Sequence, residues 1–200
     1  MSKTGRVLIA MLVLTGGLLC AAAQTPEVDP GVLAKANAGD AAAQVQAGES
    51  CAAAHDFAQA VAWYTKAANQ GSGKDSISGE IHLAALYRDG GKGFPRDMTQ
   101  AAAWYRKAAD QGDAAAQGTM GMLYMLGQGV ERSDVEAYYW LDLAAAVQGP
   151  QQAQYAANRQ AVGTRITADE LADVEDRVAK WKAAHPRPDS GPDSGPDSAQ

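Results

Sequence analysis

The thirteen residues QAVAWYTKAANQG (59–71) return almost unchanged as QAAAWYRKAADQG (100–112). Trp63 and Trp104 hold the same place in the two copies. Self-similarity with a period of about 40 residues indicates an array of short helical units, each built from one supersecondary motif.

A third, more divergent copy, SDVEAYYWLDLAAAVQG (133–149), places Trp140 at the same point. An apolar stretch with helical spacing precedes each copy, and these stretches align on Cys51, Tyr87 and Tyr124. Each unit is therefore predicted to be a helical hairpin.

The ends of the second helix of each hairpin carry recognisable signals. Asp56, Asp97 and Ser133 are expected to open these helices, because a Gln or Glu follows each of them three residues later. Glycine is expected where each helix closes in a left-handed conformation. The closing residues are predicted to be Gly71, Gly112 and Gly149.

A single hairpin cannot cover its own apolar face, so neighbouring hairpins should stack and bury a common seam. The sequence predicts an all-α fold with units at 39–71, 75–112 and 113–149, followed by a degenerate capping hairpin at 150–185. Residues 24–38 are expected to add a short capping helix in front. The predicted seam residues are Trp63, Trp104, Trp140, Tyr87 and Tyr124.

These units resemble the Sel-one-like repeat family, whose hairpins are related to tetratricopeptide repeats. The resemblance is strongest over 75–149, fair over 40–71 and weak over 150–185. It implies a right-handed α-solenoid that acts as an adaptor for other proteins, often at the cell envelope. The first unit lacks the family's glycine loop, and no unit has the cysteine pair of the branch linked to β-lactam binding. The matching residues are Gly121, Tyr124, Gly127-Gln128-Gly129-Val130, Ala101, Trp104-Tyr105, Lys107-Ala108-Ala109 and Gly112.

The two ends of the chain are expected to lie outside the fold. Residues 1–23 have the basic start, apolar run and small residues of a signal peptide, with cleavage predicted after Ala23 and export to the periplasm. Leu19 precedes Cys20 where lipid attachment needs a small residue, which argues against a lipoprotein. Residues 186–200 repeat Pro-Asp-Ser-Gly and are predicted to be a disordered tail, acting as a spacer, a tether or a docking motif.

Charge and motifs exclude several kinds of site. The net charge is −6 and becomes −8 when Lys3 and Arg6 leave with the signal peptide, so nucleic acid and anionic membranes are not expected partners. GSGKDS (71–76) departs from the phosphate-loop pattern, and the histidines lack metal-ligand spacing. We expect no catalytic residues, metal, cofactor or stable membrane insertion in the mature chain.

The remaining candidate is a concave groove lined by the first helices, which would hold an amphipathic helix or an extended peptide of a partner protein. The leading hypothesis is a periplasmic, non-catalytic adaptor; the first alternative is an immunity protein that neutralises a secreted effector. A cell-wall or β-lactam hydrolase is the second alternative, and a groove filled by residues 24–32 is also open. The groove residues are predicted to be Val45, Glu49, Ala52, Ile81, Ala85, Arg88, Gly118, Met122 and Met125.

Overall fold

A computed structural model describes residues 28–186 of the chain. The predicted signal peptide and all but the first residue of the predicted tail lie outside this range. Within it the secondary structure is helical, apart from an isolated bridge between Gly91 and Phe94. None of these helices has the length and apolar character needed to cross a membrane.

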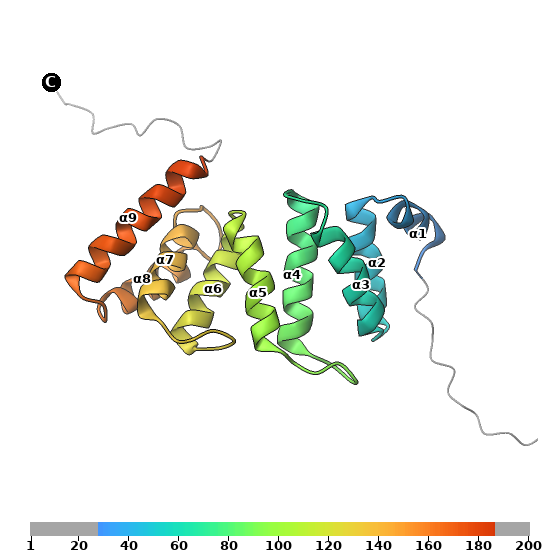
Figure 1. Cartoon of the computed structure of the whole chain (residues 1–200), viewed down its shortest axis with the longest axis horizontal. Helices are drawn as coiled ribbons and strands as arrows, with labels where there is room; N and C mark the ends of the chain where they lie inside the picture. The colour runs from blue at the N-terminus through green and yellow to red at the C-terminus, as the bar shows by residue number, and fades with distance from the viewer. Residues whose placement is uncertain (1–27, 187–200) are drawn as a thin grey trace, which may run out of the picture.

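The helices form an elongated row from α1 at one end to α9 at the other (Figure 1). The all-α prediction is confirmed for the described part of the chain. The helices are α1 (Pro30–Asn37), α2 (Ala41–Ala53), α3 (Phe57–Ala68), α4 (Lys74–Asp89), α5 (Met98–Asp110), α6 (Ala114–Leu126), α7 (Asp134–Ala145), α8 (Gln152–Gly163) and α9 (Ala168–Ala184).

Three hairpins make up the body of the row, namely α2 with α3, α4 with α5, and α6 with α7. Each second helix also packs on the first helix of the next unit, which joins α3 to α4, α5 to α6 and α7 to α8. The buried side chains form three groups: one among α1 to α4, one among α4 to α7 and α9, and one among α6 to α8. Stacking therefore closes the cores that single hairpins leave open.

The predicted helix starts are confirmed. The Asp56 carboxylate accepts a hydrogen bond from the Gln59 backbone at 3.0 Å, Asp97 caps α5 in the same way, and the Ser133 hydroxyl accepts one from Glu136 at 3.2 Å. These bonds satisfy amide groups that the first helical turn leaves without partners.

The predicted helix ends are only partly right. Gly71 and Gly112 have φ of +101° and +91° and follow α3 and α5 closely. Gly149 is a wrong prediction, because α7 already ends at Ala145 and Gly149 is not among the residues with positive φ. The last copy of the phrase thus loses its register at this end.

Small residues let the two helices of a unit approach each other. A Cβ added to Gly48 of α2 would lie 2.5 Å from the Tyr64 ring of α3. A Cβ added to Gly121 of α6 would lie 2.6 Å from the Leu141 side chain of α7. The two glycines occupy equivalent places in their units, so the same close approach is used twice.

The last two helices differ from the predicted capping hairpin. Both α8 and α9 pack on α7, and no extensive contact joins α8 to α9. Asp142 of α7 links them, since it pairs with Arg159 of α8 at 2.5 Å and with Lys182 of α9 at 2.8 Å. Burial alone would raise the pKa of Asp142, but these two hydrogen-bonded cations hold it below its ordinary value.

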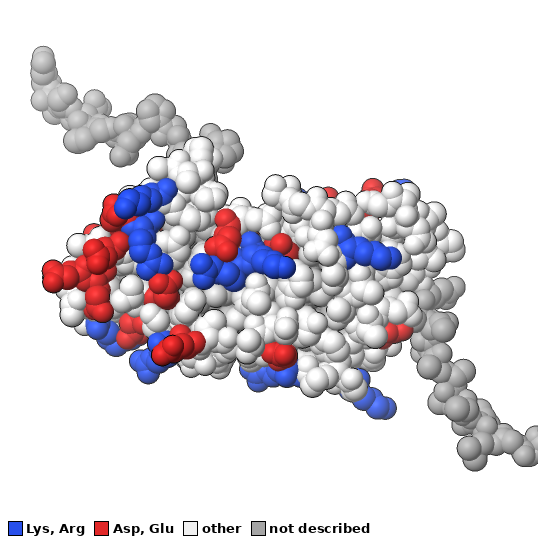
Figure 2. Space-filling view, viewed as in Figure 1, with Lys and Arg blue, Asp and Glu red and all other residues white. Residues whose placement is uncertain are grey.

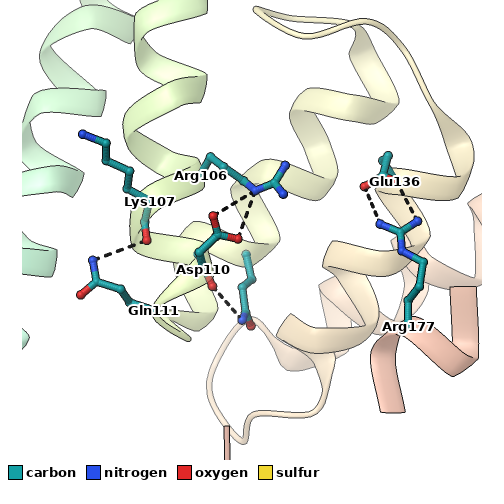
Figure 3. A network of polar contacts seen from close by, with 8 residues as sticks. Arg106, Lys107, Asp110, Gln111, Glu136 and Arg177 are labelled. Atoms are coloured by element: carbon teal, nitrogen blue, oxygen red, sulfur yellow. Dashed lines mark hydrogen bonds and ion pairs between the residues drawn. The ribbon is translucent and has the colours of Figure 1, made fainter. Parts of the chain in front are cut away.

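Helix α9 is fixed across α7 by apolar and charged contacts. Val174 and Val178 are buried, and the Arg177 guanidinium pairs with Glu136 of α7 at 2.8 Å (Figure 3). The same guanidinium lies 4.6 Å from the centre of the Tyr139 ring. Charged side chains of both signs gather at the end where α9 lies, whereas the opposite half of the same face is mostly uncharged (Figure 2).

Candidate partner-binding groove

One face of the first helices α2, α4 and α6 keeps at least part of its surface exposed. Its residues recur at three equivalent positions in each unit, spaced so that they share one side of a helix. We call this surface the first-helix wall. It consists of Gln46, Glu49 and Ala53 of α2, His82, Ala85 and Asp89 of α4, and Thr119, Met122 and Leu126 of α6.

A polar contact joins the first two helices of the wall. The His82 Nε2 atom lies 3.1 Å from the Glu49 carboxylate, and its Nδ1 atom lies 2.8 Å from the Ser78 carbonyl oxygen. The imidazole also packs at 4.9 Å from the Tyr64 ring. The Glu49 side chain keeps 52% of its surface exposed, so it can still meet a charge on a partner.

The α6 part of the wall is apolar. Met122 is 39% exposed and Leu126 is 64% exposed, which makes them two of the three large hydrophobic side chains exposed in the described residues. They lie one helical turn apart, so they form one continuous surface. A flexible methionine beside an exposed leucine is typical of surfaces that adapt to an apolar partner.

Two predicted groove residues are buried instead. Val45 is only 7% exposed and belongs to the core shared by α1 to α4. Gly118 is covered by the Tyr155 ring of α8, which occupies the space that a side chain at 118 would need. Neither residue can contact a partner, so the prediction is wrong for both.

Other predicted groove residues lie at the edge of the wall. Ile81 is half-buried and lines a hollow beside the turn between α5 and α6, and Met125 is half-buried against the α7–α8 core. Arg88 donates to the Tyr105 hydroxyl at 2.9 Å and pairs with Asp89, whose hydrogen bond raises the pKa of the guanidinium. Ala52 is also half-buried.

The equivalent positions Glu49, Ala85 and Met122 are the predicted residues that lie on the wall. The set of equivalent positions that contains Val45 and the set that contains Arg88 each lie one residue before a set of wall positions. One residue corresponds to a rotation of about 100° around a helix. The missed residues are their sequence neighbours, of which Leu126 is a large hydrophobic side chain that is 64% exposed. Exposure is a property of the structure, so the sequence alone offered no signal for these positions.

The predicted seam residues all contact the core but differ in burial. Trp140 is fully buried and Trp63 is 9% exposed, whereas Trp104 is half-buried and packs against the two core groups on either side of it. Tyr87 also touches both groups, and Tyr124 is half-buried between the second and third.

Cations cover the three indoles. The Lys66 ammonium lies 3.9 Å from the Trp63 ring centre and that of Lys107 lies 3.7 Å from the Trp104 ring, in both cases one helical turn along. Leu143 holds the matching place after Trp140, whose ring is covered by Arg106 of α5 instead, at 4.9 Å. Arg106 is in turn held by Asp110 (Figure 3). These contacts shield the seam from water on the second-helix side.

The described part of the chain lacks two features of reactive sites, a metal-ligand cluster and an activated thiol. The described residues contain no group of three or more His, Cys, Asp or Glu side chains placed to hold a metal ion. Cys51 is buried, and burial raises the pKa of its thiol, which disfavours the reactive thiolate.

Comparison with known proteins agrees with this architecture. A family model for the Sel1 repeat matches residues 42–72, 77–113 and 114–146, which together make up about half of the chain. The chain belongs to the Sel1 repeat family. Sel1 repeat proteins generally mediate protein–protein interactions, and their fold is typically a non-catalytic scaffold.

Two solved structures are similar to this member of the Sel1 repeat family. One is c5321, a protective antigen of uropathogenic Escherichia coli, with 32% identity over 76% of this chain and a TM-score of 0.63. The chain spans only 32% of the length of c5321. The other is a Sel1 repeat protein from Oxalobacter formigenes, with 26% identity over 62% of this chain, 92% of its own length and a TM-score of 0.52. No curated protein matches the sequence.

Proposed function

We propose that this protein is an exported, non-catalytic adaptor that holds an amphipathic helix of a partner protein on its first-helix wall. The observation that carries the proposal is the exposed pair Met122 and Leu126 on the same surface as Glu49. A helix fits because the wall offers a strip of small and apolar side chains, with Ala85 between the acidic and the apolar ends.

The charge of the chain defines the partner further. The net charge is −6, or −8 without residues 1–23, and the wall carries Glu49, whose side chain is half exposed. The other wall carboxylate, Asp89, already pairs with Arg88. Electrostatic complementarity favours a helix whose apolar side is flanked by Lys or Arg. The apolar side would cover Met122 and Leu126, and a basic side chain would approach Glu49.

Replacing Met122 and Leu126 together with glutamate is expected to weaken partner binding by 100-fold or more, because an apolar contact would become two buried charges (roughly 3 kcal/mol or more). A photo-crosslinking amino acid at position 122, in cells that make the protein, would capture the partner. Binding of its crosslinked segment, synthesised as a peptide, would then be measured by calorimetry.

The matched control is Ala103→Glu on the exposed side of α5, which should bind the peptide as the wild type does. Circular dichroism would verify that all variants remain folded. Undiminished affinity of the Met122/Leu126 double variant, or a captured segment without an apolar helical face, would contradict the proposal.

Export makes a separate prediction. Protein purified from the producing cells should begin at Gln24, because the small residues before it fit a signal peptidase. Intact-mass measurement and N-terminal sequencing of the periplasmic fraction test this directly. A chain that retains residues 1–23, or one that carries lipid on Cys20, would refute the proposed processing.

A further inference from the structure

Glu80 of α4 is a carboxylic acid in a place where the other units carry an amide. When the three first helices are aligned, Glu80 takes the position that Gln44 holds in α2 and Gln117 holds in α6. All three side chains are buried, with exposures of 4% for Glu80, 5% for Gln44 and none for Gln117. The second unit thus hides an ionisable group where its neighbours hide a neutral one.

The two glutamines tie each first helix to the helix before it. The Nε2 group of Gln44 donates to the Ala36 carbonyl at 3.0 Å, and that of Gln117 donates to the Ala109 carbonyl at 3.1 Å. An amide can donate and accept at the same time, whereas an ionised carboxylate can only accept. Glu80 therefore cannot repeat this contact while it is charged.

The second unit uses another residue for the lost contact. The carbonyl that matches Ala36 and Ala109 is that of Ala68, and the Ser76 hydroxyl lies 2.9 Å from it. Glu80 keeps only the accepting half of the role: within residues 28–186 its one hydrogen bond comes from Gln111 Nε2, at 2.7 Å. The same bond in the first unit runs from Gln70 to Gln44, also at 2.7 Å.

The surroundings of Glu80 disfavour its charged form. Burial raises its pKa to about 7, the nearby Asp110 carboxylate of α5 adds to this rise, and Lys107 of the same helix opposes it. On the α3 side the packing is tight, because a Cβ added to the adjacent Gly79 would lie 2.9 Å from the Ala68 backbone nitrogen. A single hydrogen bond is little compensation for a buried carboxylate.

We propose that Glu80 is a proton-operated joint of the second unit, which holds α4 firmly between α3 and α5 when neutral and loosens it when ionised. The stability gained from the neutral form is fully present below the ordinary pKa of a glutamic acid and is lost as the pH rises through about 7. Because α4 carries His82 and Ala85, the middle of the first-helix wall would become less rigid in alkaline conditions.

The test compares the mature wild-type protein with Glu80→Gln in urea unfolding from pH 5.5 to 8.5. The unfolding constant of the wild type, divided by that of Glu80→Gln, should rise by about 30-fold over this range, because the raised pKa makes only the wild type less stable as Glu80 ionises. The exposed loop residue Glu131, changed to glutamine, is the control and should follow the wild type. A constant ratio between wild type and Glu80→Gln would overturn the proposal.

A second measurement does not depend on a variant. Carbon-detected NMR titration of the wild-type glutamate carboxyls should show Glu80 changing state near pH 7. Protection of α4 and α5 from hydrogen exchange should fall as the pH rises toward 7, more than protection of α6 and α7. A Glu80 midpoint in the ordinary range of exposed glutamates would refute the proposal that ionisation of Glu80 loosens α4. Neither readout involves a partner, so the result is independent of the proposed binding function.

Discussion

Replacing Trp140 with alanine is expected to destabilise the protein by about 3–5 kcal/mol, the usual loss for a buried indole. The indole is fully buried in α7, where the Tyr139 ring meets it edge to face at 4.9 Å and the Arg106 guanidinium lies over its ring. Urea unfolding followed by circular dichroism measures the loss.

The position of α7 predicts how the Trp140→Ala variant unfolds. Both α8 and α9 pack on α7, whereas α1 to α4 have a core of their own. The variant should therefore lose its C-terminal helices in a first transition, before the N-terminal units unfold, as expected for a stack held by nearest-neighbour contacts.

Two variants serve as controls for Trp140→Ala. Trp140→Phe keeps an aromatic ring and removes an indole N–H that has no hydrogen-bond partner among the described residues, so it should cost less than the alanine change. Trp181→Ala removes a half-buried indole from the end of α9, stacked on His185, and should cost less than the Trp140 change. A Trp140→Ala variant as stable as Trp181→Ala would show that the seam is not the main source of stability.

Gly129→Ala is expected to cost about 2–5 kcal/mol, because it combines left-handed backbone strain with overpacking. Gly129 has φ of +72° in the loop between α6 and α7. An added Cβ would overlap the Met98 carbonyl group at the start of α5, and a backbone group cannot rotate aside as a flexible side chain can. The loop would have to leave α5, which separates the third unit from the second. Thermal unfolding of the variant checks this.

The chain offers a matched control for this change as well. Gly149 has open space around its Cβ position and does not have positive φ, so Gly149→Ala should change stability by less than about 0.5 kcal/mol. Equal stability of the two alanine variants would mean that the glycine loop does not hold the units together.

The sequence predicts the repeated parts of the fold because residues at equivalent positions in the copies have the same structural role. Trp63, Trp104 and Trp140 align the second helices, and the capping residues at 56, 97 and 133 set where those helices start. The Gly127-x-Gly129 loop follows from the same logic, and both glycines have positive φ as the turn requires. These features are local, so a pattern along the chain is enough to find them.

The features that the sequence did not predict depend on how helices are oriented in space. An error of one residue, about 100° around the helix, exchanged buried Val45 for exposed Gln46, although the wall itself was expected. The separation of α9 from α8 comes from pairs such as Arg177 with Glu136, which are distant in sequence and have no counterpart in another unit. Glu80 was missed because its burial matters only once its three-helix environment is known.

The way α9 folds back over α7 bears on how such an array can lengthen during evolution. A tandem copy inserted between α5 and α6 would meet the same kind of neighbour on each side, because that junction repeats the one between α3 and α4. A copy added after α8 would lack the second helix of a preceding hairpin on which to stack, because α9 packs on α7 and not on α8. Gains and losses of units should therefore occur among α2 to α7 rather than after α8.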